Sequence, residues 1–188
     1  KLKYILSGTN TNTEGVAVPK NWSWFKNDVR NIKHISYKFM KQRLITFPSF
    51  STFSYIYYES IKRIKWVLFL DYFDYVKEEA IQELMHKCDF SPYPYKHYES
   101  VFTRFYQAYI LIKKFNVDKR KLHFSNLIVS DQLSRDKALQ LLKMSSYPSI
   151  QEEKDDIKYF LKKMNWDEEM LHNYINKPEI PHTNYKSE

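Results

Sequence analysis

The sequence predicts an α/β fold, in which a short parallel sheet near the N-terminus precedes a mostly helical C-terminal region. Tyr4 to Ser7 is an apolar run that ends in the polar turn Gly8-Thr9-Asn10, the pattern of a buried parallel strand. Trp66 to Leu70 is a second candidate strand. After residue 75, apolar residues recur almost throughout at helical spacing. We therefore expect an α/β part over residues 1–75 and a helical substrate-binding part over residues 76–188.

The composition limits the class of protein. The 188 residues are 43% hydrophobic and 18% aromatic, which is enough for one domain with a substantial core. A net charge of +8 favours an anionic partner, and the single cysteine, Cys88, excludes an internal disulfide. The longest apolar run is far below the roughly 20 residues of a membrane-spanning helix. We expect a soluble, cytoplasmic protein without a membrane partner.

Two helices are expected between the candidate strands. The first runs from about Lys26 to Phe39, and Pro48 ends that region. The second lies within Phe53 to Ile64. The residues at helical spacing are Val29, Ile32 and Ile35 in the first helix, and Tyr57, Ile61 and Ile64 in the second.

Helix breaks and caps divide the chain after residue 75. Lys77 to Lys87 is an expected helix, and the next begins near His97. Within that helix, Val101 to Phe115 follows a 3.6-residue period and predicts a central, largely buried segment. The residues that set this period are Val101, Phe102, Phe105, Tyr109 and Ile112.

Capping signals place the last two helices. Ser149 and Glu152 have capping-box spacing. Asp167 is the expected cap of the last helix, with Trp166 and Leu171 spaced as a hydrophobic staple. Lys177-Pro178 ends that helix.

The loop after the first strand carries groups that suit a nucleotide. Ligands of open α/β sheets bind at the carboxyl ends of strands, and Mg²⁺ prefers oxygen ligands. Thr9, Asn10 and Glu14 are therefore candidates for binding ATP and Mg²⁺, with Glu14 as the metal ligand. The alternative is an ordinary polar loop. The chain has only two glycines, Gly8 and Gly15, so it does not contain a phosphate loop built from several glycines.

Further polar residues surround the predicted central helix and the basic stretch Asp118-Lys119-Arg120-Lys121. Basic groups that converge on one cleft would suit a pyrophosphate or a sugar nucleotide. The alternative is a solvated surface. The residues expected in this cleft are Lys96, His97, Glu99, Arg104, Lys119, Arg120, His123, Gln132 and Arg135. The histidines lack paired metal-ligand spacing, so we do not expect a transition-metal site.

Several sequence blocks, taken in order, carry a resemblance to a known family. They are Lys3 to Asn10 with Thr13-Glu14-Gly15, Trp22, Asp28 to Lys33, Lys96 to Ser100, Phe102 to Gln107, Lys113 to Phe115, Asp118 to Arg120, His123, Ser125, Leu127-Ile128 and Gln132 to Leu139. In these blocks the chain resembles the N-acetyl sugar amidotransferases. These are PP-loop ATP-pyrophosphatase enzymes of surface-polysaccharide biosynthesis, including that of lipopolysaccharide and of nonulosonic acids such as pseudaminic acid.

The resemblance implies a reaction and its partners. ATP would activate the oxygen of a sugar-bound N-acetyl group as an adenylate, and ammonia from a separate glutaminase subunit would displace AMP and leave an acetamidino group. The sheet would then be a remnant of a PP-loop, adenine nucleotide alpha hydrolase-like fold. His97, Glu99 and Arg104 would be catalytic. Lys96, Lys119, Arg120, His123, Gln132 and Arg135 would bind the nucleotide-activated N-acetyl sugar.

The chain departs from the family pattern at three places. The PP-loop would lie upstream of Lys1, so we expect this chain to be a C-terminal part that is inactive alone. Pro94-Tyr95 stands where the family usually has two glycines, and Asp131 stands where one glycine is usual.

Two other readings stay open. A PP-loop enzyme that modifies tRNA would use the positive charge and the sixteen tyrosines for phosphate contacts and stacking. A non-catalytic helical interaction module is the other. The ordered polar blocks favour the sugar amidotransferase, for which nucleic acid is not an expected partner.

Overall fold

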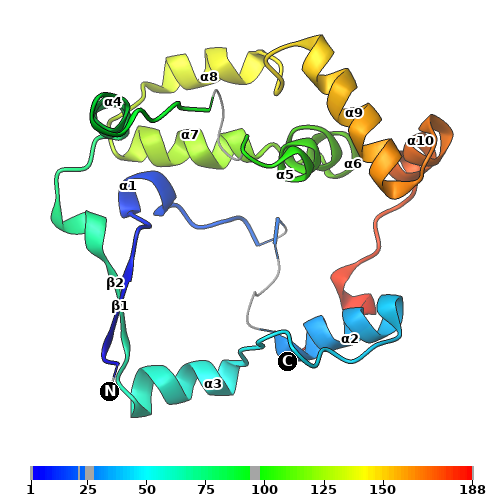
Figure 1. Cartoon of the computed structure of the whole chain (residues 1–188), viewed down its shortest axis with the longest axis horizontal. Coiled ribbons are helices and arrows are strands. Elements are labelled where there is room, and N and C mark those ends of the chain that lie inside the picture. The colour runs from blue at the N-terminus through cyan, green and yellow to red at the C-terminus, as the bar shows by residue number, and fades with distance from the viewer. Residues whose placement is uncertain (1, 21, 24–27, 94–97, 188) are drawn as a thin grey trace. The chain divides into compact units, whose positions relative to one another are not determined.

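The computed structural model describes residues 2–20, 22–23, 28–93 and 98–187. This part of the chain is mostly helical, with one small sheet (Figure 1). In chain order the elements are β1 (Tyr4–Ser7), α1 (Thr11–Glu14), α2 (Val29–Met40), α3 (Thr52–Ile56), the π-helical η1 (Tyr57–Ile61), β2 (Lys65–Leu68), the 3-10 turn η2 (Phe69–Tyr72), α4 (Lys77–Cys88), α5 (Val101–Phe105), the π-helical η3 (Tyr106–Ile110), α6 (Leu111–Phe115), α7 (Lys119–Val129), α8 (Arg135–Lys143), α9 (Ile150–Met164), α10 (Glu168–Asn176) and the 3-10 turn η4 (His182–Asn184). Among the described helices, none has the length and apolar character needed to cross a bilayer.

The chain forms two compact units, which are described separately below. The first unit comprises Lys1–Gly8, Val18–Phe69 and Glu179–Glu188. The second comprises Thr9–Ala17 and Leu70–Pro178. Each unit therefore combines segments that lie far apart in the sequence.

The sheet in the first unit is parallel, as the sequence predicts. β1 pairs with β2 so that Tyr4 lies opposite Lys65 and Ser7 opposite Leu68. Leu6 is 66% exposed and Trp66 is 64% exposed, and strand alternation places these two side chains on opposite faces. Both faces of the sheet therefore present apolar side chains to solvent, so the prediction of a buried first strand is wrong: Tyr4 and Leu6 are exposed and only Ser7 is buried.

Helix α2 buries a more polar face than its spacing predicts. Val29 is buried, as expected, whereas Ile35 is 38% exposed. The other buried residues of α2 are Asn31 and Ser36. Asn31 donates to the backbone oxygen of Lys186, 3.1 Å away, so the chain's last residues occupy the face on which apolar neighbours are expected.

The core of the second unit is built around the predicted central helix. The elements α5, η3 and α6 run without a break from Val101 to Phe115. Phe105, Ile110, Phe160 and Leu171 form a buried cluster, and the ring centroids of Phe105 and Phe160 are 4.6 Å apart. The central, buried helix is thus confirmed, although Phe102 lies at its edge and is 59% exposed.

The predicted N-caps of α9 and α10 both form. The Ser149 side chain accepts from the backbone N–H of Glu152 at 3.1 Å, and Asp167 accepts from that of Met170 at 2.7 Å. Each side chain satisfies an N–H group that the helix itself leaves unpaired. Trp166 and Leu171 both pack into the core, which fixes the entry to α10.

Phe105 and Phe102 provide a matched test of this core. We expect Phe105→Ala to lower the free energy of unfolding by about 3–5 kcal/mol, because it leaves a cavity in close-packed surroundings. Phe102→Ala removes the same atoms from an exposed position and should cost about 1 kcal/mol or less. Urea denaturation of both variants measures the difference, and equal losses would show that Phe105 is not the centre of the core.

Candidate functional site

The loop that follows β1 is held by two acceptor side chains. The Asn10 side chain, in a buried residue, caps α1 by accepting from the backbone N–H of Thr13 at 2.9 Å. Asp71 accepts from both the backbone N–H and the hydroxyl of Thr11, with the N–H bond at 2.7 Å. These bonds favour the ionised carboxylate and hold the pKa of Asp71 below its usual value. A negative charge therefore lies beside the start of α1.

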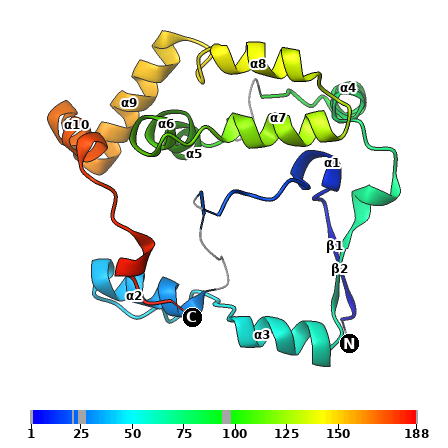
Figure 2. The ribbon, with the colours of Figure 1, turned by 180° about the vertical axis from the view of Figure 1, so that it is seen from behind.

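Helix α1 packs against α7, and Figures 1 and 2 agree that the two lie side by side. The backbone N–H of Val16 donates to Oδ1 of Asn126 at 2.7 Å. The Ser130 hydroxyl donates to the backbone oxygen of Asn12 at 3.2 Å. The loop residues expected near ATP are thereby fixed against a helix that carries residues expected near the sugar.

A cluster of polar groups lies where the start of α4 meets α7 and the residues after it. We call Asn12, Tyr75, Lys77, His123 and Gln132 the Lys77 cluster. The backbone oxygen of Tyr75 accepts from the side-chain amides of Asn12 at 2.9 Å and of Gln132 at 3.1 Å. Oε1 of Gln132 accepts from the backbone N–H of Lys77 at 3.1 Å, and Nζ of Lys77 lies 3.5 Å from Nε2 of His123.

The Lys77 cluster combines groups that suit a phosphate ligand. An ammonium carries three donors, and an imidazole donates from at least one ring nitrogen. Gln132 uses both ends of its amide to position the backbone that carries Lys77. The cluster thus places the flexible ammonium of Lys77 beside the His123 ring, while Gln132 holds the backbone of Lys77 in place.

A second cluster joins α5 to α9 and includes the predicted catalytic residue Arg104. Arg104 makes a bidentate pair with Asp156, with Nε and Nη2 at 2.6 and 2.5 Å from the two carboxylate oxygens. The guanidinium carbon lies 4.5 Å from the centre of the Tyr98 ring, and the Tyr98 hydroxyl donates to Glu152 at 3.0 Å. We call these four residues and Tyr147, which is buried near Asp156, the Arg104 cluster.

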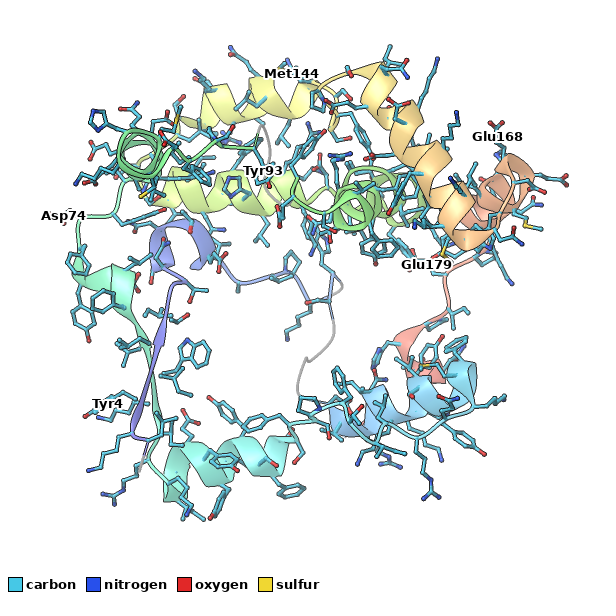
Figure 3. The ribbon with its side chains drawn as sticks, viewed as in Figure 1. Tyr4, Asp74, Tyr93, Met144, Glu168 and Glu179 are labelled. Atoms are coloured by element: carbon cyan, nitrogen blue, oxygen red, sulfur yellow. The ribbon has the colours of Figure 1, made fainter. Side chains whose placement is uncertain are left out.

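Asp156 is only 2% exposed, so its charge depends on Arg104. Figure 3 shows the side chains of α5 and α9 filling the space between these helices. A buried ion pair with one member removed leaves an uncompensated charge, which is strongly destabilising. The pair therefore gives Arg104 a structural role that its position in a polar stripe does not predict.

Asp156 had a detectable sequence signal. It stands four residues before Phe160, so both belong to the same face of α9, and that face is apolar. A carboxylate on a core-facing stripe requires a cationic partner.

The side chain of Arg120, a residue of α7, reaches the C-terminal end of α8. Its Nη1 donates to the backbone oxygens of Met144 at 2.9 Å and Ser145 at 3.1 Å, and its Nη2 pairs with Asp118 at 2.8 Å. Figure 3 labels Met144 just beyond the last turn of α8. A cation at this point satisfies carbonyls that the helix leaves without partners.

The remaining candidate residues are either exposed or outside the described part of the chain. Thr9 is exposed just before α1 and Glu14 is exposed as the last residue of α1. Glu99 is exposed just before α5, and Lys119 and Arg135 are exposed as the first residues of α7 and α8. Lys96 and His97 lie outside the described residues. Direct contacts therefore bring His123 and Gln132 together through Lys77, whereas Arg104 and Arg120 contact other elements.

The first loop fits Mg²⁺ only in part. Mg²⁺ is commonly held by one or two carboxylates together with phosphate oxygens and water. Glu14 and Thr9 are compatible with such a site, but Oδ1 of Asn10 already accepts from the backbone N–H and the hydroxyl of Thr13. Within the described ranges, no three His, Cys, Asp or Glu residues gather in a way that would hold a metal ion.

The backbone explains the departure at Asp131. This residue follows α7 with a φ of 56°, in the left-handed region that favours glycine. Aspartate is among the residues that tolerate this conformation best. A left-handed turn that glycine would favour is thus made here by an aspartate.

Comparison with known families bears on the helical half of the chain. Residues 99–188 match the family model described as "LPS biosynthesis protein WbpG-like, C-terminal domain". This segment resembles that domain. The match confirms the resemblance to the C-terminal part of a polysaccharide-biosynthesis family, and it contains the Arg104 cluster except Tyr98. No curated protein and no solved structure matches the chain.

The Arg104 pair can be tested by removing either member. We expect Arg104→Ala to destabilise the protein by about 3–5 kcal/mol, because Asp156 would stay buried without its cation. Arg104→Ala/Asp156→Ala should lose less than the two single losses added together. A double-mutant cycle from urea denaturation measures this coupling, and strictly additive losses would contradict the pair's structural role.

The same cluster predicts instability at high pH. Burial raises the pKa of the Tyr98 and Tyr147 hydroxyls, and the nearby carboxylates of Glu152 and Asp156 raise it further. Since the folded state holds these protons more tightly, the contribution of the two tyrosines to stability is constant below the unfolded pKa of about 10 and falls as pH rises above it. Tyr147→Phe should reduce that fall in a series of melts from pH 8 to 11. An unchanged slope would rule out Tyr147 as its source.

Proposed function

We propose that this chain is the C-terminal part of a PP-loop-type N-acetyl sugar amidotransferase that acts in lipopolysaccharide biosynthesis. The observation that carries the proposal is the match of residues 99–188 to a WbpG-like C-terminal domain. The order of the sequence blocks and the predicted parallel strands support it independently.

The exposed sheet supports the PP-loop part of the proposal. Parallel strands occur almost only in sheets covered on both faces. β1 and β2 are four residues long, and they expose Tyr4, Leu6 and Trp66. A two-stranded sheet of this kind is the expected edge of a larger α/β sheet, and we propose that the enzyme supplies the remaining strands and the pyrophosphate-binding loop.

The Lys77 cluster is the proposed binding site for the diphosphate of the sugar nucleotide. Lys77 would contact the phosphates, with His123 beside it as a second donor. Gln132 would act as a positioning residue, since its amide holds the backbone N–H of Lys77 and the carbonyl of Tyr75. This role joins two residues predicted from the sequence to one that only the fold brings near them.

ATP, when bound, would supply an adenylyl group that turns the amide oxygen of the sugar into a leaving group. Glu14 and Thr9 would orient the nucleotide with Mg²⁺ at the end of the first loop. Glu99 or His97 would accept the proton released when ammonia, delivered by a glutaminase subunit, adds to the activated carbon. Arg104, through its pair with Asp156, would position the start of α5, next to which Glu99 lies.

The charge distribution bears on the tRNA alternative. The first unit has thirteen Lys and Arg against four Asp and Glu, whereas the second has seventeen against eighteen. The Lys77 cluster lies in the nearly neutral second unit, which suits a small anion with two phosphates better than a polyanion. The basic first unit is the part to which RNA would bind.

An oxygen-labelling experiment tests the proposed chemistry in the complete enzyme. A nucleotide-activated N-acetyl sugar labelled with heavy oxygen in the amide should transfer that oxygen to AMP, because the adenylate carries it away. Mass spectrometry of AMP and of the sugar product measures the transfer. Label that appears in pyrophosphate or stays on the sugar would contradict the mechanism.

A substitution tests the proposed site separately. Lys77→Ala should raise the KM for the sugar nucleotide about tenfold or more, which corresponds to about 1.4 kcal/mol. Lys87→Ala is the matched control, since it changes an exposed lysine of the same helix, which pairs with the exposed Glu83. Equal effects of the two variants would remove Lys77 from the site.

A further inference from the structure

The last residues of the chain lie along α2 in the first unit. We call residues 179–187 the C-terminal strap; Figure 3 labels Glu179 at its start, and Figure 2 shows it reaching α2. The Asn31 side chain donates to the backbone oxygen of Lys186 at 3.1 Å and lies 3.4 Å from Nε2 of His182. Nζ of Lys38 lies 4.7 Å from the centre of the Tyr185 ring.

A further contact between the strap and α2 requires a neutral histidine. The backbone N–H of Lys186 donates to Nδ1 of His34 at 3.0 Å. A ring nitrogen accepts a hydrogen bond only when it carries no proton, so His34 holds the strap as the tautomer protonated at Nε2. The imidazolium form has two donors and cannot accept this bond.

Most of the charged residues around His34 are basic. On α2 the neighbouring charged residues are Arg30, Lys33 and Lys38, and the helix has no acidic residue within its bounds. Asp28, the buried cap of α2, accepts from Asn31. On the strap the titratable or charged residues are Glu179, His182, Tyr185 and Lys186, and the Tyr185 ring lies edge-on to His34 with centroids 6.1 Å apart.

We propose that His34 makes the strap a pH-sensitive latch, which is closed when its imidazole is neutral and released when it is protonated. Protonation removes the acceptor for Lys186 and adds a positive charge to a helix that is already basic. Because imidazole changes charge between about pH 5 and 8, the latch would respond within the physiological range.

Hydrogen exchange at the Lys186 amide tests the latch. NMR-detected exchange in the full chain, corrected for intrinsic rates, should show at least tenfold less protection at about pH 5.5 than at about pH 7.5. His34→Ala should be unprotected at both values, since it has no acceptor. Equal protection of the unsubstituted protein at the two values would overturn the proposal.

Two variants separate His34 from other titrating groups. His34→Asn places a non-titrating acceptor near the position of Nδ1, so protection should persist at both pH values. His172→Asn changes an exposed histidine of α10 and should leave the pH response intact. A His34→Asn protein that still loses protection at low pH, or a His172→Asn protein that keeps it, would show that His34 is not the switch.

Discussion

The pair between Arg104 and Asp156 is the constraint on which the second unit depends. Arg104 precedes Phe105 in the chain, and Asp156 lies one turn before Phe160, so the ion pair and the aromatic contact between Phe105 and Phe160 share one interface. Moving α5 relative to α9 would break both at once. The pair is also directional, because a bidentate guanidinium and carboxylate align in one plane. Aromatic packing supplies the contact area, and the ion pair selects one register for it.

This constraint affects the expected catalytic site. Tyr98 and Glu99 come just before α5, and the ring of Tyr98 lies over Arg104 while its hydroxyl reaches Glu152. The start of α5 is thereby tied to α9 from two sides. A residue in a fixed helical segment is a better support for chemistry than one in an untethered loop. The proposed function thus assigns Arg104 to positioning and places phosphate binding at Lys77.

Local signals made much of the fold predictable. The strand at Tyr4, the caps at Ser149 and Asp167 and the buried helix around Phe105 each depend on a few neighbouring residues, so the sequence pattern identifies them directly. The face of α2 was predicted less well, because Asn31 is buried by the strap, which lies about 150 positions away in the sequence. Periodicity alone cannot identify a polar partner from so distant a segment.

The sequence identified individual residues of the candidate site but did not identify the residues with which they interact. His123 and Gln132 stood out as polar residues in a basic stretch, but their connection through Lys77 depends on how α4 meets α7. Arg104 stood out as a polar side chain on an aromatic helix, and the sequence did not reveal that Asp156 would engage it. In both cases the residue type was visible in the sequence, and the tertiary partner decided the role.

The proposed function places the diphosphate of a nucleotide-activated N-acetyl sugar at the Lys77 cluster. Isothermal titration of this chain with a panel of nucleoside-diphosphate N-acetyl sugars measures that binding directly. We predict saturable binding that weakens about tenfold in Lys77→Ala and stays unchanged in Lys87→Ala. Binding of equal strength in Lys77→Ala and the unsubstituted chain, or no binding of any sugar nucleotide by a folded chain, would contradict the account.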